Sequence, residues 1–344
     1  MTEQVTVWFP AFQKTSHTLN KIAFTLFGRF EVRWYGILIT LGIILAFTYI
    51  GWRGKKNEGI LFDNVIDVGL LTVVLGIVGA RIYYVLTSLD EYHSFYDVIA
   101  IWNGGIAVYG SIIGGCTGIL IMCAVKKINW RKFFDATAPA VLFAQALGRW
   151  GNFFNGEAYG SRITDTTKYY FFLKEFDLPS GEGTLFHFFR MGLIPNDYSR
   201  YTMVFVHPTF LYESIWNLVG FIWINLFYKH KKFDGQIALL YFTWYGFGRM
   251  FIEGFRTDSL YIGGNIRISQ LVGLLCFVVG TVLLIVFGVK SRKQAAVCVG
   301  ELTVIEDQAD ETATEETTED STTEDPATEA ENTENSTDSQ PPVA

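Results

Sequence analysis

Long apolar runs recur along the chain and constrain its fold more than any other feature. Half of the 344 residues are hydrophobic and only 18% are charged. A helix needs roughly 20 apolar residues to cross a bilayer, and a spanning segment must satisfy its own backbone. We therefore predict an all-α polytopic membrane protein with about seven transmembrane helices. The seven runs are Trp34–Trp52, Val68–Leu86, Gly104–Val125, Phe133–Phe154, Pro208–Phe227, Ile237–Phe251 and Ile268–Val289.

The negative net charge of −7 comes from the end of the chain. From Glu301 onward there are 15 Asp and Glu residues and no Lys or Arg. The 34 acidic residues of the chain less these 15 leave 19, against 27 basic ones, so the preceding part is basic. A Thr/Glu-rich stretch buries too little apolar surface to offset its ordering entropy. We therefore expect residues 294–344 to form a disordered acidic tail.

Basic residues predict the orientation in the membrane. Clusters follow the first, third, fifth and seventh runs, and the short loop between the second and third runs has no Lys or Arg. Because such clusters stay on the cytoplasmic side, the N-terminus should lie outside and the acidic tail inside the cell. Residues 1–33 lack the apolar stretch of a cleaved signal peptide, and their aromatic residues suggest an interfacial arm. Residues 34–293 form the predicted membrane domain.

With this orientation, the polar motifs meet at the outer ends of the spans. They are WNGGIAVYGSIIGG, GRWGNFFNGEAYG, HPTFLYES and YGFGRMFIEGFR, which begin at Trp102, Gly148, His207 and Tyr245. Ionisable residues inside a span are costly and usually face a polar cavity with a partner. The charged residues there are Arg149, Glu157, Arg249, Glu253 and Arg256. Arginine suits a phosphate diester, so a lipid headgroup is the expected ligand.

Purely structural roles compete with this interpretation. Arg149 could be the ion-pair partner of Glu157 or Glu253. Arg249 and Glu253 could be a helix-stabilising pair four residues apart. Arg256 could extend to the outer headgroups.

Three other features are equally well explained by structure. Arg81 lies deep in the second span, where structural pairing is as plausible as function. His207 precedes a proline at an interface and fits a hydrogen-bonded surface histidine. The spacing of Gly110, Gly114 and Gly118 favours close helix packing.

One long outer segment remains, and we expect it to form a small extracellular cap at about residues 157–207 that receives a second substrate. The four cysteines show no paired spacing, so disulfides are not expected. No His/Cys ligand spacing or Gly-rich nucleotide loop is present, so we expect no metal, no cofactor and no nucleic acid partner.

The polar motifs together resemble those of one family. GRWGNFFNGEAYG resembles the signature of the bacterial prolipoprotein diacylglyceryl transferases. RWYG, GARIYYVL, WNGGIAVYGSIIGG, HPTFLYES, YGFGRMFIEGFR and RISQ agree with that family in order and spacing. The resemblance covers about Val32 to Lys290.

The resemblance implies a seven-span enzyme of the bacterial cytoplasmic membrane. Such an enzyme transfers the diacylglyceryl group of phosphatidylglycerol to the lipobox cysteine thiol of a prolipoprotein signal peptide, and glycerol phosphate is released. The catalytic residues that the resemblance and the charge pattern indicate are Tyr35, Tyr109, Arg149, Asn152, Glu157 and Arg249. Those indicated for binding phosphatidylglycerol are Arg149, Asn152, Asn155, Gly160, Glu253 and Arg256.

One position departs from the family pattern. Tyr109 stands in the third-span motif where a well-studied member has a histidine. Tyrosine can donate a hydrogen bond or orient a group, but it is a poor base at neutral pH. A histidine base is therefore absent from that position, and the base lies elsewhere or none is needed.

A secondary transporter for an anionic solute is the alternative function. Transporters usually show repeated halves and a binding site near the midplane. The sequence shows no clear repeat, and its polar motifs cluster toward one face.

Overall fold

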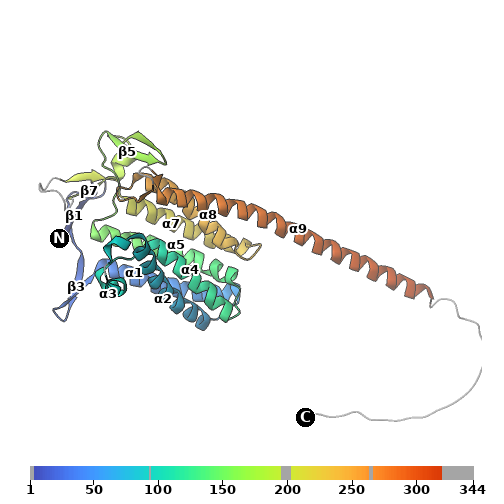
Figure 1. The fold of residues 1–344 in the computed structure, drawn as a ribbon. Coiled ribbons are helices and arrows are strands. Elements are labelled where there is room, and N and C mark those ends of the chain that lie inside the picture. The colour runs from blue at the N-terminus through green and yellow to red at the C-terminus, as the bar shows by residue number, and fades with distance from the viewer. Residues whose placement is uncertain (1–3, 93, 195–202, 263–265, 320–344) are drawn as a thin grey trace, which may run out of the picture. The chain divides into compact units, whose positions relative to one another are not determined.

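The computed structural model describes residues 4–92, 94–194, 203–262 and 266–319, and it is mostly helical (Figure 1). The chain divides into two compact units, Met1–Val289 and Lys290–Ala344. The long helices are α1 (Trp34–Arg53), α2 (Phe62–Thr87), α4 (Val108–Val125), α5 (Trp130–Asn155), α7 (Thr209–Phe227), α8 (Gln236–Ile252) and α9 (Ile268–Glu319). Two short helices are α3 (Phe95–Ile99) and α6 (Leu185–Phe189).

Within the described residues, five helical stretches are long and apolar enough to cross a membrane, in agreement with a polytopic membrane protein. They are Trp34–Glu58, Phe62–Thr87, Val108–Val125, Thr209–His230 and Ile268–Gln294. The other two predicted spans also coincide with helices. However, α5 carries the charged residues Asp135 and Arg149, and α8 has only 17 residues. The count of seven spans stays a prediction.

Glycines allow α2 and α4 to pack with their backbones close together. A Cβ atom on Gly79 of α2 would lie 2.5 Å from the carbonyl oxygen of Gly110 on α4. A Cβ atom on Gly118 would lie 2.9 Å from the Cα atom of Thr72. Small residues are the usual means of close approach between helices in lipid. The glycines of the third predicted span therefore serve helix packing, as expected.

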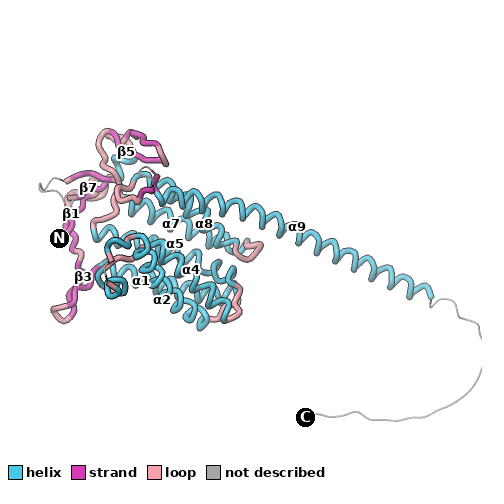
Figure 2. The backbone as a smooth tube through the Cα atoms, in the orientation of Figure 1, coloured by secondary structure: helices cyan, strands magenta, loops and turns pink. Residues whose placement is uncertain are grey.

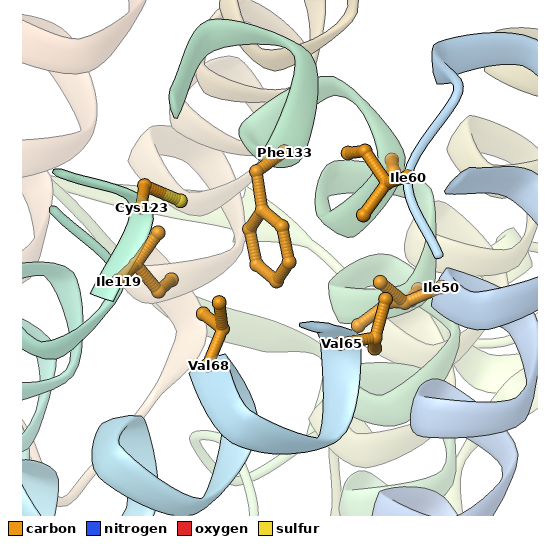
Figure 3. Packing of buried hydrophobic residues seen from close by; sticks show 9 residues of the cluster. Ile50, Ile60, Val65, Val68, Ile119, Cys123 and Phe133 are labelled. Carbon is orange, nitrogen blue, oxygen red and sulfur yellow. The ribbon is translucent and has the colours of Figure 1, made fainter. Parts of the chain in front are cut away.

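A hydrophobic cluster joins α1, α2, α4 and α5 (Figure 3). The ring of Phe133 of α5 lies in the middle of the labelled residues, which come from α1 (Ile50), the segment before α2 (Ile60), α2 (Val65 and Val68) and α4 (Ile119 and Cys123). Because α5 also packs against α7 and α8, it connects α1 and α4 with α7 and α8. That central position allows polar side chains of α5 to meet those of α7 and α8.

Strands gather at one end of the bundle, so the fold is mostly helical rather than all-α as predicted (Figure 2). Segments outside the apolar runs can pair their backbone groups with neighbouring strands instead of within a helix. One sheet has the order β2-β1-β7-β8, and three two-stranded hairpins accompany it. The strands are β1 (Gln4–Trp8), β2 (His17–Asn20), β3 (Ile22–Leu26), β4 (Phe30–Arg33), β5 (Thr166–Phe171), β6 (Lys174–Pro179), β7 (Met191–Leu193), β8 (Val204–Val206), β9 (Tyr261–Ile262) and β10 (Ile266–Arg267).

The last helix extends beyond the apolar run that starts it. α9 continues from Ile268 to Glu319, whereas the sequence predicts disorder from residue 294. Residues 320–344 of the predicted tail lie outside the described residues. Disorder of the acidic tail therefore stays a prediction.

Candidate active site

A buried carboxylate lies at the centre of a cluster of arginines. Glu213, in the first turns of α7, is 2% exposed. Its Oε1 atom lies 2.7 Å from Nη2 of Arg149, and its Oε2 atom lies 2.9 Å from Nη1 of Arg249. Nη1 of Arg256 lies 3.8 Å from the same Oε2 atom. One carboxylate thus draws together arginines from the end of α5, the end of α8 and the segment after α8.

Two further carboxylates contact Arg249, near the end of α8, and Arg256, in the segment after α8. Glu253 lies 2.6 Å from Nη2 of Arg249, one helical turn away. Arg256 donates from Nε and Nη2 to the two oxygens of Asp258, at 3.0 and 2.7 Å. Burial works to raise the pKa of the Asp258 carboxyl, but the hydrogen bonds from Arg256 hold the pKa below its ordinary value. Asp258 therefore stays charged and fixes the orientation of Arg256.

Arg267, the last residue of β10 and directly before α9, also contacts this segment. It is 2% exposed, and its Nη1 atom donates to the backbone carbonyls of Glu253 and Arg256, the latter at 2.9 Å. Its guanidinium lies over the ring of Tyr170, 4.5 Å from the centroid. The turn after α8 is therefore connected to α9 and to the β5–β6 hairpin.

A chain of amide contacts leads from Arg149 to the surface. Arg149 donates from Nη1 to Oδ1 of Asn152 at 3.3 Å. The side-chain amides of Asn152 and Asn155 both donate to Oε1 of Glu157, at 3.0 and 3.2 Å. Glu157 is exposed. This chain connects four of the predicted site residues in the order in which they leave α5.

The arginines line a cavity of about 380 Å³ between the helices. Five predicted site residues line it, namely Tyr109, Arg149, Arg249, Glu253 and Arg256. Val108, Ile112, Leu260 and Val272 supply an apolar part of the wall. A cavity with guanidinium groups beside apolar side chains can receive a phosphate diester that carries acyl chains.

Tyr35 and Gly160 lie elsewhere, and neither is among the described residues that line this cavity. Tyr35 begins α1, and its ring packs against Gly151 of α5, where a Cβ atom would lie 2.7 Å from the ring. Gly160 pairs with Arg256 as an isolated β-bridge. A Cβ atom there would lie 2.6 Å from Cβ of His207 and 3.0 Å from the carbonyl oxygen of Phe255, so glycine allows both of these segments to approach.

Glu213 is the principal site residue that the sequence interpretation missed. The sequence analysis considered Glu157 or Glu253 as the partner of Arg149, but the structure pairs Arg149 with Glu213. The signal was present, because Glu213 falls inside an apolar run and an ionisable residue there usually has a partner. Asp258 and Ser269, which line the cavity, were also missed, although Ser269 lies within RISQ, one of the motifs that resemble the family.

Arg81 and His207 have structural partners. Arg81 donates to the backbone carbonyls of Val98 at 2.8 Å and of Asp97 at 2.6 Å, so it holds the loop after α2. The His207 ring contacts the hydroxyls of Tyr212 at 3.2 Å and of Thr167 at 3.0 Å. His207 is hydrogen-bonded as expected, but it is fully buried rather than at the surface. Burial lowers the pKa of His207 to about 4.

Within the described residues, one group of carboxylates has the spacing of a metal site, at the far end of α5 from Arg149. Ligand atoms of Glu58, Asp135 and Asp234 lie within 4.8 Å of one another. The Nζ atom of Lys231 lies 2.7 Å from a carboxylate oxygen of Glu58, 2.9 Å from one of Asp135 and 3.3 Å from one of Asp234. Burial works to lower the pKa of Lys231, but hydrogen bonds to Glu58 and Asp135 raise the pKa overall. A protein cation therefore already occupies the place of a metal.

Comparisons with known proteins agree with the resemblance seen in the motifs. A family model described as prolipoprotein diacylglyceryl transferase matches residues 21–286. The chain is 41% identical over 278 residues to phosphatidylglycerol–prolipoprotein diacylglyceryl transferase 1 of Clostridium perfringens (strain 13 / Type A), covering 80% of this chain and 97% of that protein. It is 39% identical over 268 residues to the phosphatidylglycerol–prolipoprotein diacylglyceryl transferase of Staphylococcus aureus (strain Newman), covering 78% and 88%.

These matches extend over most of the chain, and the family model, which covers residues 21–286, includes every described residue that lines the cavity. They confirm the resemblance and the prediction of an enzyme, and they leave the alternative of an anion transporter without support. The chain is a multi-pass membrane enzyme that belongs to the prolipoprotein diacylglyceryl transferase family.

Proposed function

We propose that this chain transfers the diacylglyceryl group of phosphatidylglycerol to the lipobox cysteine of a prolipoprotein, and that the 380 Å³ cavity is where the transfer occurs. The observation that carries the proposal is the set of three arginines held at the cavity by buried Glu213. The names of the two relatives specify the same lipid and the same acceptor.

The proposed reaction is a substitution at carbon. The thiolate sulfur of the cysteine attacks the glycerol carbon that bears the phosphodiester, so an S–C bond forms and the C–O bond breaks. The electron pair of that bond leaves with the oxygen. The phosphodiester monoanion therefore becomes a phosphate monoester dianion, glycerol phosphate. The thiol proton passes to a carboxylate, for which we propose Glu253, because it lines the cavity, whereas Glu157 is exposed and is not among the described lining residues.

The arginines act on the charge that develops on the leaving phosphate. Donors fixed in place before the reaction stabilise such charge without reorganising. We assign this role to Arg149 and Arg249, with Glu213 as the residue that positions both. Asn152 orients Arg149, and Arg256 contacts the headgroup. Tyr109 lines the same cavity and acts as a hydrogen-bond donor rather than as the base.

The membrane arrangement is part of the proposal. α5 and α8 complete seven spans, the strand-bearing end faces outward, and the acidic tail lies in the cytoplasm. Residues 1–33 serve as the interfacial arm, and the segment at about 157–207 serves as the outer cap that receives the prolipoprotein. Support comes from α5, which is 26 residues long and packs against α1, α7 and α8.

A transfer assay tests the proposed function. Purified protein in detergent receives phosphatidylglycerol and a lipobox peptide, and the peptide mass and released glycerol phosphate are followed. We expect the peptide to gain one diacylglyceryl unit, and a peptide with alanine in place of cysteine to gain nothing. A folded protein that transfers nothing to the cysteine peptide would refute the proposal.

A matched pair of variants on one helix tests the assigned cavity. Arg149→Ala should reduce transfer by about a thousandfold or more, because the charge on the leaving phosphate loses a fixed donor. Arg131→Ala removes an exposed arginine from the other end of α5 and should leave transfer unchanged. Equal activity of the two variants would move the reaction away from the cavity.

A further inference from the structure

A second pocket adjoins the cavity on the side of the strands. It has a volume of about 510 Å³ and is lined by the β5–β6 hairpin and the segments around residues 161 and 257. We call it the hairpin pocket and define it by Arg162, Lys168, Arg256, Arg267 and Asp177. Lys168 and Asp177 face each other across the hairpin as register partners.

Arg256 forms the wall between the two spaces, because it lines both of them. Its guanidinium is 9% exposed and is held by Asp258, which lines the cavity. Arg267, on the other side, lines the hairpin pocket and holds the carbonyl of Arg256. The Nε atom of Arg267 is buried without a hydrogen-bond partner. A group leaving the cavity past Arg256 therefore enters a space lined by further cations.

The balance of charge differs between the two spaces. Three arginines and two carboxylates line the cavity, and buried Glu213 adds a third carboxylate behind them. Among the described residues, four cations and one carboxylate line the hairpin pocket. Lys168 also contacts Glu175, and the side chain of Lys168 remains 62% exposed. An anion that gains a second negative charge in the cavity is attracted more strongly by the hairpin pocket.

The remaining lining suits a small hydroxylated molecule rather than an acyl chain. Hydroxyl groups of Ser161, Thr164, Thr166 and Thr257 line the hairpin pocket. Hydroxyl side chains both donate and accept hydrogen bonds, as the hydroxyls of a polyol do. The pocket therefore combines cations for a phosphate with partners for alcohol groups.

We propose that the hairpin pocket binds the polar product, a small phosphate monoester bearing hydroxyl groups, as it leaves the cavity. This inference rests on the proposed function, which supplies glycerol phosphate as that product. The pocket gives the dianion a route toward water that avoids lipid. Arg256 contacts the phosphate first in the cavity and then in the hairpin pocket.

Product inhibition tests the proposal. Glycerol 3-phosphate is added to the transfer assay at several concentrations of phosphatidylglycerol. Because the product has its own pocket, we expect inhibition that saturating phosphatidylglycerol does not remove. Lys168→Gln should raise the inhibition constant about fivefold, since it removes one exposed charge from the pocket. Lys174→Gln is the matched control on the same hairpin, is not among the described lining residues, and should leave the constant unchanged.

Direct binding separates this inference from the proposed function. Radiolabelled glycerol 3-phosphate is bound to the protein without peptide or lipid, with inorganic phosphate and glycerol as competitors. We expect glycerol 3-phosphate to compete better than inorganic phosphate, and glycerol not to compete. Inhibition that is purely competitive with phosphatidylglycerol and equal in Lys168→Gln and wild type would overturn the inference. Absence of transfer by wild type would refute the proposed function, whereas the binding measurement tests the hairpin pocket independently of transfer.

Discussion

The two ends of α5 carry inverted charge clusters. Near its end, one carboxylate, Glu213, contacts three arginines. Near its start, one ammonium, Lys231, contacts the three carboxylates Glu58, Asp135 and Asp234. Asp135 and Arg149 mark the two clusters and lie roughly 21 Å apart along the helix axis.

The difference lies in how many donors remain for a ligand. An ammonium has three N–H donors, and the three carboxylates around Lys231 use that capacity. A guanidinium has five, so Glu213, Glu253 and Asp258 can orient three arginines and still leave N–H groups toward a cavity. Both clusters bury charge, but only the arginine cluster has the donors to bind an anion. The ratio of N–H donors to carboxylates therefore distinguishes a binding site from a structural cluster.

The largest expected effect is on the arginine cluster. Glu213→Gln keeps the size of the side chain but removes the charge that holds three guanidinium groups in place. Transfer should fall by about a hundredfold to a thousandfold, because the fixed donors lose their orientation. The measurement is kcat/KM in the transfer assay, with Glu31→Gln as an exposed control that should match wild type. Near-normal activity would show that Glu213 does not position the arginines.

The ammonium cluster should instead affect stability. Lys231→Met leaves two buried carboxylates, Glu58 and Asp135, and the partly exposed Asp234 without their cation, and it should lower the free energy of unfolding by about 3–5 kcal/mol. Thermal unfolding in detergent measures this, with exposed Lys229→Met expected to change stability by less than about 0.5 kcal/mol. The folded fraction of Lys231→Met should still transfer. A Lys231→Met variant that was stable but inactive would contradict the assignment of a structural role to the Lys231 cluster.

Buried His207 predicts a dependence of stability on pH at the strand-bearing end. Its pKa is about 4 in the folded protein, below the ordinary value near 6.5, because burial disfavours the charged form. The unfolded chain therefore binds a proton first as pH falls. Stability is unaffected above about pH 6.5, declines between about 6.5 and 4, and reaches a loss of about 3 kcal/mol below that range. Unfolding measured at several pH values should show this slope, and His207→Gln should remove it. If stability depended on pH equally in wild type and His207→Gln, titratable groups other than His207 would be the cause.

The smallest effect concerns Tyr109. If it only donates a hydrogen bond to the lipid, Tyr109→Phe should reduce transfer by about tenfold or less. Single-turnover rates with the lipobox peptide measure this change, and Tyr83→Phe, whose ring lies beside that of Tyr109, is the control. A loss of about a thousandfold would give Tyr109 a part in the chemistry and would extend the active cluster to α4.

Much of the helical framework could be predicted because its cause is local. Each of the seven apolar runs overlaps a helix in the structure, since lipid requires every backbone group to be paired within its own segment. The strands could not be found in the same way. Val7 pairs with His17 and also with Leu193, and that second pairing depends on a segment far away in the sequence.

The candidate site was predicted in part for a related reason. Arg249 and Glu253 lie one turn apart on a helix, so their ion pair follows from spacing. Arg149 and Glu213 are on different helices, and their contact depends on how α5 and α7 pack. The sequence offered Glu157 and Glu253 as partners of Arg149 because all three fall at the predicted outer ends of the spans.

The sequence by itself determined the membrane character, the family and the end of the bundle at which the polar motifs meet. These follow from length, hydropathy and motif order, which are properties of segments taken singly. Only the tertiary structure decided that Glu213 gathers the arginines, that His207 is buried, and that Arg256 separates two pockets. Those features depend on distances between segments far apart in the chain, and packing rather than local pattern fixes such distances.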